Sequence, residues 1–177
     1  MEKVNLYQKM TEKSPQQESM GGLKKAYELL GAKTPLELSN LYSIEDQKLM
    51  KSNNWDYANP DLITNKVKNI LESINESDLT DEEKEWRQEI LWFWYHHAIS
   101  CAIWRYQDKE AAKLYASRAL EYQSEDHPNK VTKLLHLLVN DQFEEAEEWA
   151  QTIQEEPEKG TGSELLKEYK EQGFFKK

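Results

Sequence analysis

The segment from Ile90 to Trp104 is the longest stretch of the sequence without a charged residue. It follows a charged stretch that begins at Asp81, and the two together predict one helix over 81–105. The last two thirds of this helix are apolar on nearly every side, which is typical of a helix surrounded by other helices. We therefore expect it at the centre of the fold, with its charged first turns in solvent. The apolar part is too short for a membrane span, which needs about 20 apolar residues.

Capping signals mark the ends of the other helices. A capping Ser, Thr or Asn precedes proline or acidic residues at Ser14, Thr34, Asn59, Thr80 and Ser163. Gly31 and Gly173 stand where helices are expected to stop. Together with the hydrophobic spacing, these signals predict helices over 3–12, 15–30, 35–42, 44–52, 60–75, 81–105, 109–122, 128–139, 142–155 and 164–172. Because no segment alternates apolar and polar residues over the length of a strand, the predicted fold class is all-α, an irregular helical bundle.

The spacers between the predicted helices are short, so we expect a single all-helical domain over residues 1–177. Its N-terminal helices occupy 1–80. The part over 81–177 holds the central helix, the helical hairpins described next and a closing helix.

Two helices in the second half share a pattern at a spacing of 34 residues. Glu110, Ala112, Tyr115 and Ala116 recur as Glu144, Ala146, Trp149 and Ala150. A period of 34 with small and aromatic positions resembles the tetratricopeptide repeat (TPR). The resemblance covers 93–155 and implies two TPR-like antiparallel hairpins, in which 109–122 and 142–155 are the second helices. It also implies that Ala112 and Ala146 each face a partner helix at close range.

The charge of the chain disfavours nucleic acid and membrane as partners. The sequence has 33 acidic residues against 23 Lys and Arg, and therefore a formal net charge of -10. Nucleic-acid binding starts from clustered Lys or Arg, and the sequence contains no such cluster. The first ten residues have no apolar core of the signal-peptide type, and the single Cys101 excludes an intramolecular disulfide. We expect a cytoplasmic protein with a protein or peptide partner, a homodimer being one option.

Trp55 and Tyr57 are candidates for the interface with such a partner. They lie in a polar segment between predicted helices, where exposed aromatic side chains can anchor a partner. The alternative, which the sequence supports equally, is that they fold down and cap the bundle.

Arg105 and Arg118 are further interface candidates. With Arg87 they are the only arginines in the sequence. A guanidinium can hold a carboxylate or phosphate through two parallel hydrogen bonds, which an ammonium cannot. The alternative is an ion pair with an acidic residue of a neighbouring helix, for which we expect Glu110, Glu121 or Asp126.

The alternative to an interface for a protein partner is a metal-binding site. Glu82, Glu85, Glu89 and His96 fall on one stripe of the helix over 81–105. Carboxylates at this spacing can hold Mg²⁺ or Mn²⁺, which prefer oxygen ligands and keep waters for substrate phosphates. The stripe supplies half of the paired acidic motifs of some all-α nucleotide pyrophosphohydrolases, and the second half is missing. Acidic residues at a helix start also interact favourably with the helix dipole, which is the structural alternative.

Two functions remain. The first is a non-enzymatic protein- or peptide-binding module that needs no cofactor. The second is a metal-dependent all-α enzyme that acts on a nucleotide or a nucleic-acid-related phosphate through the acidic stripe. The repeat, the excess of acidic residues and the lack of a complete catalytic constellation favour the binding module.

Overall fold

The computed structural model describes residues 27–29, 31–33, 37, 48, 51, 56–125, 129–153 and 161–175. None of these residues lies in a strand, and most are helical, which confirms the all-α prediction. The helix predicted over 3–12 lies outside the described residues, and so does most of 15–30, 35–42 and 44–52. No helix in the described ranges has the length and apolar character needed to span a membrane.

The helices of the second part of the chain agree closely with the prediction. Their bounds are α4 (Ile63–Ser73), the 3₁₀ helix η1 (Glu76–Asp78), α5 (Asp81–Ser100), the π-helix η2 (Cys101–Tyr106), α6 (Lys109–Glu121), α7 (Lys130–Val139), α8 (Phe143–Ile153) and α9 (Thr161–Gln172). Each helix predicted from residue 60 onward is present. The short η1 and the π winding of η2 are additions that the sequence pattern did not predict.

The ends of the helices follow from short-range hydrogen bonds. Thr80 and Glu83 form the predicted capping box, because the Thr80 hydroxyl accepts from the Glu83 amide at 3.3 Å and the Glu83 carboxylate accepts from the Thr80 amide at 2.9 Å. Asn59 was expected to open a helix. Its side chain instead accepts from the amide of Asp61 at 3.0 Å and closes a turn, so α4 begins only at Ile63.

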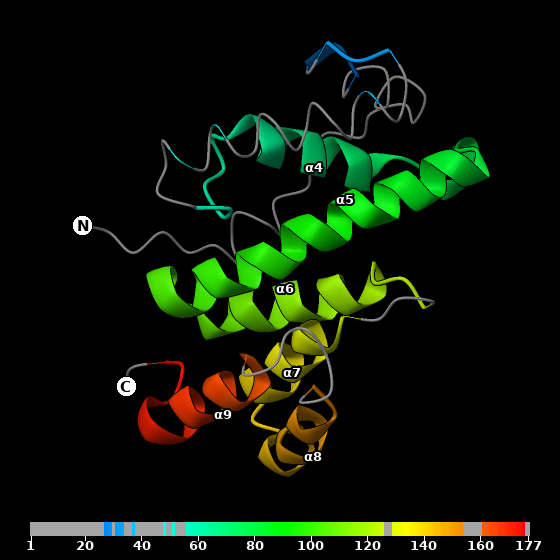
Figure 1. Cartoon of the computed structure of the whole chain (residues 1–177). Helices are drawn as coiled ribbons and strands as arrows, with labels where there is room; N and C mark the ends of the chain where they lie inside the picture. The colour runs from blue at the N-terminus through cyan, green and yellow to red at the C-terminus, as the bar shows by residue number, and fades with distance from the viewer. Residues whose placement is uncertain are drawn as a thin grey trace.

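The helices form successive layers in which each packs mainly on the next one in sequence (Figure 1). The links between η2 and α6 and between α7 and α8 are so short that the chain must reverse direction. Accordingly Gln88, near the start of α5, donates to the carbonyl of Gln123, beyond the end of α6, at 3.3 Å. Contacts also skip one helix: His96 of α5 lies 2.8 Å from the hydroxyl of Thr132 in α7, and α9 packs on both α7 and α8.

These contacts pair α5 with α6 and α7 with α8, as the two predicted hairpins require. Ala112 and Ala146 are both fully buried, so each faces neighbouring helices at close range. The pairing does not by itself establish a tetratricopeptide fold, because any array of sequential antiparallel helices pairs in the same way.

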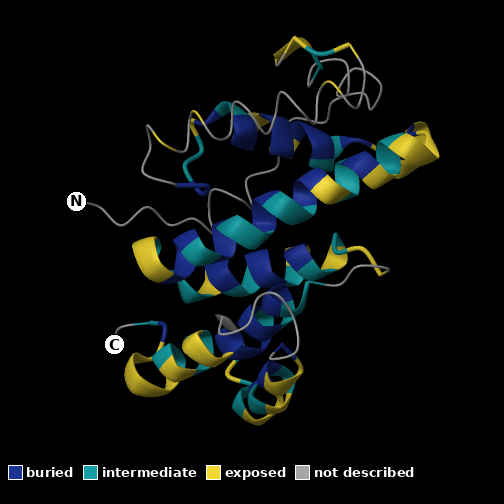
Figure 2. Cartoon of the chain, in the orientation of Figure 1, coloured by how far each residue is buried: buried dark blue, intermediate teal, exposed yellow. Residues whose placement is uncertain are grey.

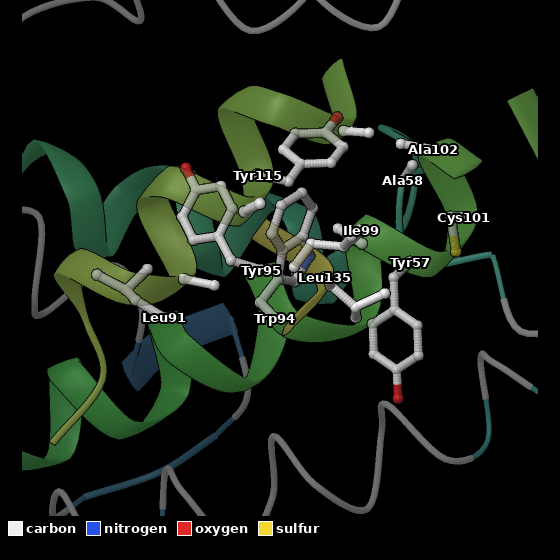
Figure 3. Close-up of a cluster of buried hydrophobic side chains, with 14 of the residues drawn as sticks. Tyr57, Ala58, Leu91, Trp94, Tyr95, Ile99, Cys101, Ala102, Tyr115 and Leu135 are labelled. Atoms are coloured by element: carbon white, nitrogen blue, oxygen red, sulfur yellow. The ribbon is translucent and has the colours of Figure 1, made fainter. Parts of the chain in front are cut away.

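The core is built around α5, and its charged first turns are exposed, as predicted (Figure 2). Trp94 is the central side chain, with 1% of its surface exposed. Its ring meets those of Tyr95 and Tyr115 edge-on, at centroid distances of 5.0 and 5.6 Å (Figure 3). The predicted burial of the whole apolar segment is wrong at its end, because Trp104 is 42% exposed.

A buried ion pair lies between α4 and α5. The Lys68 ammonium is 3.0 Å from the Glu72 carboxylate and 4.5 Å from the centre of the Trp94 ring. The Tyr95 hydroxyl donates a hydrogen bond to the same carboxylate. Burial lowers the pKa of Lys68, and the charge of Glu72 partly opposes that shift.

Candidate binding surface

The C-terminal end of α5 changes its winding in η2. The amides of Gln107 and Asp108 both donate to the carbonyl of Ala102, and Gln107 takes the left-handed conformation at φ 52°. A π-type turn contains more residues than an α turn, so the side chains that follow point in directions a continuous α-helix would not give them. Trp104 and Arg105 lie in this turn, and both are exposed.

The Asp56 carboxylate binds the two polar side chains at the end of this turn. This residue is 6% exposed, and its Oδ2 accepts from the Tyr106 hydroxyl at 2.5 Å and from the Arg105 guanidinium at 3.4 Å. Burial and the hydrogen bond to Asp56 raise the pKa of Tyr106, so its hydroxyl remains a donor. The other oxygen, Oδ1, is buried without a hydrogen-bond partner in the described structure. The carboxylate therefore fixes Arg105 and Tyr106 relative to the loop before α4.

Trp104 is held in place from α9. Its indole N–H donates to the Glu168 carboxylate at 2.7 Å, and its ring meets the Phe174 ring edge-on at 5.7 Å. The Gln107 side chain adds a link by donating to the Phe174 carbonyl at 3.1 Å. The exposed indole is thus fixed at its edge while the remaining surface is open to solvent.

Tyr57 takes the second of its two sequence alternatives. It is 7% exposed, stacks on His97 at a centroid distance of 4.7 Å and meets Phe93 edge-on at 6.1 Å. It therefore caps the bundle and is not an exposed anchor. Trp55 lies outside the described residues.

Arg118 lies far from Arg105. It is near the C-terminal end of α6, which runs antiparallel to α5, whereas Arg105 follows the C-terminal end of α5. The guanidinium of Arg118 donates to Glu121 of its own helix at 2.7 Å. The structure therefore does not join the two arginines in one site. The pair of Arg118 and Glu121 lies within one helix, so the expected ion pair to a neighbouring helix is wrong for Arg118, and Arg105 pairs with Asp56, which is not one of the three expected partners.

The residues of the metal alternative are not gathered into one site. Glu82, Glu85 and Glu89 are exposed on the first turns of α5. His96 faces α7, where its Nδ1 is 2.8 Å from the Thr132 hydroxyl, and its ring stacks on Trp92 at 5.3 Å. Burial, with a smaller effect of the His97 charge, lowers the pKa of His96 to about 4. Within the described ranges no three His, Cys, Asp or Glu residues form a group that could hold a metal ion.

Cys101 and His97 are neighbours on one face of the central helix, yet neither is set up as a nucleophile or its base. Burial raises the pKa of the Cys101 thiol, although the amides of Tyr57 and Ala58 oppose this shift. Burial also lowers the pKa of His97. A reactive cysteine needs a lowered pKa, so this one is a core thiol.

A groove of about 540 Å³ lies between α8 and α9. Ala150 and Leu166 contribute its apolar part. Its charged side chains pair with one another, Lys170 with Glu147 and Lys167 with Glu171, so the groove has no excess charge to offer a ligand.

Comparison with known proteins gives no relative: no family model, no curated protein and no solved structure matches this chain. The resemblance to the tetratricopeptide repeat therefore rests on the residues themselves.

The surface around Trp104 contains several residues that sequence reasoning missed. The sequence pattern indicates no role for Asp56, Tyr106, Glu168 or Phe174, and it predicts Trp104 in the core. One local signal could have indicated its exposure: the next residue, Arg105, ends the apolar segment, and Asp108 then caps α6.

Proposed function

We propose that this chain is a non-enzymatic protein- or peptide-binding module whose contact surface is centred on Trp104 and Arg105. The observation that carries the proposal is the exposure of Trp104. Among the large hydrophobic side chains of the described residues, only Trp104 and Leu29 are exposed, at 42% and 36%. Trp and Arg are enriched among the residues that dominate the energy of protein interfaces.

The fixed geometry of this surface supports the same function. The indole edge of Trp104 is bonded to Glu168, and Arg105 is bonded to Asp56. Side chains that are already held lose less conformational freedom when a partner binds, so more of the contact energy appears as affinity. The sequential helices supply a rigid support for the turn that carries both residues.

The charge of the chain indicates the chemistry of the partner. Residues 81–177 contain 21 acidic and 13 basic side chains. An excess of negative charge attracts basic partners and speeds their association at low salt. We expect a partner that covers the Trp104 ring with an apolar or cationic side chain and carries Lys or Arg around it. The metal-dependent alternative has no comparable support, because the acidic stripe is not part of a metal-binding group in the described residues.

Selection from a random peptide library on the immobilised full chain tests the proposal. The affinity of each selected peptide is then measured by calorimetry with the unmodified chain and with Trp104→Ala and Arg105→Ala. We expect each substitution to weaken binding at least tenfold. The control is Glu144→Ala, at an exposed position on α8, which should bind as the unmodified chain does.

Peptides that bind Trp104→Ala as tightly as the unmodified chain would refute the proposed surface. Affinity should also fall as salt is added, because the partner is expected to be basic. Sedimentation equilibrium of the same proteins tests whether the chain forms a homodimer. A dimer that dissociates in the Trp104→Ala variant would identify the partner as a second copy of the chain.

A further inference from the structure

Phe174 packs on the proposed contact surface although it lies outside the helices. After α9 ends at Gln172, Gly173 takes φ 65° and donates to the Tyr169 carbonyl at 2.9 Å. The chain then turns back toward the layers of α5 and α6 (Figure 1). The Phe174 ring meets Trp104 edge-on at a centroid distance of 5.7 Å, and 4% of the residue is exposed. Phe174 therefore covers part of the Trp104 ring.

Two kinds of contact hold Phe174, one to its backbone and one to its ring. The side-chain amide of Gln107 donates to the Phe174 carbonyl at 3.1 Å. The Phe174 ring meets Trp104 and Tyr169 edge-on, at centroid distances of 5.7 and 5.2 Å. Proteins that bind peptides use the same combination, in which backbone hydrogen bonds supply affinity and side-chain contacts supply specificity. The bond from Trp104 to Glu168 does not involve Phe174, so the indole is held in place for another aromatic ring.

The sequence that begins at Phe174 has the composition expected of the partner. Residues 174–177 read Phe-Phe-Lys-Lys, two aromatic residues and then two basic ones. This order stands out because residues 81–177 contain 21 acidic and only 13 basic side chains. The proposed partner likewise places an apolar group on the Trp104 ring and carries basic residues beside it. The chain thus has a short sequence of the partner's kind at its own contact surface.

The charges at this surface favour a basic neighbour. Glu168 accepts from the Trp104 indole, and no ion pair joins it to a basic residue in the part of the chain that the structure describes. The basic side chains of η2, of α9 and at the start of α6 each have a carboxylate partner: Arg105 with Asp56, Lys167 with Glu171, Lys170 with Glu147, and Lys109 with Asp141. The charge of Glu168 therefore remains available to attract a lysine or arginine of a ligand.

We propose, on the basis of the proposed function, that the partner presents an aromatic side chain followed by basic residues, and that Phe174 occupies the place of that side chain when no partner is bound. Phe174 belongs to the same chain and is always near Trp104, so it competes effectively with a free peptide. If Phe174 is in place in about 90% of the molecules, the partner binds about tenfold more weakly than it binds the uncovered surface.

Fluorescence anisotropy with a labelled peptide of the sequence Gly-Phe-Phe-Lys-Lys, residues 173–177, tests this role of Phe174. Binding is measured with the unmodified full chain and with Phe174→Ala, in which no ring of the chain's own covers Trp104. We expect Phe174→Ala to bind the peptide at least tenfold more tightly. The gain should be lost when Trp104→Ala is added to Phe174→Ala. It should also be lost when the first phenylalanine of the peptide is replaced by alanine.

Phe143→Ala is the matched control for a general loosening of α9. The Phe143 ring stacks on Tyr169 at a centroid distance of 6.0 Å, so its removal weakens the packing of α9 while Phe174 keeps its place. This variant should bind the peptide as weakly as the unmodified chain does. Circular dichroism verifies that each variant is folded. Phe174→Leu, which keeps an apolar side chain, replaces Phe174→Ala if the latter is not folded.

Three results would overturn the role of Phe174: equal peptide affinities of Phe174→Ala and the unmodified chain, an equal gain in Phe143→Ala, or a gain that survives the loss of Trp104. The proposed function fails in a different way, because no peptide from the random library would then depend on Trp104. Library peptides that depend on Trp104 but bind Phe174→Ala no more tightly would keep the contact surface and refute only the role of Phe174.

Discussion

Exchanging Glu72 for glutamine removes the carboxylate that neutralises the buried ammonium of Lys68. The two members of this ion pair differ in their surroundings, because 3% of the Lys68 side chain is exposed against 24% of the Glu72 side chain. Glu72 alone can be solvated in part and keeps the hydrogen bond from Tyr95. Lys68 alone is enclosed by Trp94, Tyr95 and the helix that carries it. The two substitutions should therefore have very different costs.

The expected magnitudes follow from this difference. Removing one partner of a buried ion pair typically costs about 3–5 kcal/mol, because a charge is left uncompensated. The cost at pH 7 has an upper limit of about 5 kcal/mol, the free energy of deprotonating an amine with a pKa of 10.5 at that pH. We expect Glu72→Gln to cost about 3–5 kcal/mol. Lys68→Met, which removes the enclosed charge and keeps the length of the side chain, should stay within about 1.5 kcal/mol in either direction.

Urea unfolding at pH 7 of the parent, both single variants and the double variant measures these costs and their coupling. The deficit of Glu72→Gln should also shrink from pH 7 to pH 9. Burial lowers the pKa of Lys68, and removing Glu72 lowers it further, so the unfolded amine binds more protons in this range. Equal costs for the two single variants, or a larger cost for Lys68→Met, would refute the reasoning.

Three further results are expected. Trp94→Ala should cost about 3–5 kcal/mol in denaturant unfolding, because the ring is 1% exposed; an unchanged midpoint would contradict the central position of α5. Ala112→Leu and Ala146→Leu should each cost about 1–3 kcal/mol in thermal unfolding, since both residues are fully buried; a neutral result at either would remove the case for two equivalent hairpins. Burial, with the charge of His97, lowers the pKa of His96 from 6.5 to about 4, so the unfolded chain binds the extra proton and this residue alone lowers stability by about 2 kcal/mol from pH 7 to pH 5. His96→Gln should remove that part of the pH dependence, and a variant that keeps the full slope would assign it to other groups.

Features set by nearby residues could be predicted from the sequence. The capping box of Thr80 and Glu83 needs only two residues three positions apart, so it was recognisable without the fold. Gly173 was placed correctly for the same reason: its φ of 65° and its bond to the carbonyl of Tyr169 end α9 through local geometry. The apolar character of α5 likewise indicated a helix between other helices.

Features that depend on distant partners could not be predicted. Hydrophobicity placed Trp104 in the core, but its position depends on the π winding of η2 and on Glu168, which is 64 residues away. Tyr57 lies in a polar segment, and only the packing against His97 and Phe93 shows that it is buried. The exposure of an aromatic side chain is a property of the assembled helices, and the local signals at Arg105 and Asp108 mark only where the apolar segment ends.

The order in which the helices pack has a consequence for the speed of folding. From α4 to α9 each helix rests mainly on its neighbour in sequence, so most contacts join residues that are close along the chain. Little loop entropy is lost before such contacts form, and proteins dominated by them fold in microseconds to milliseconds. Adjacent helices can pair as soon as both exist, without waiting for a remote part of the chain. Because the links between η2 and α6 and between α7 and α8 are tight, we expect these two pairs to close first.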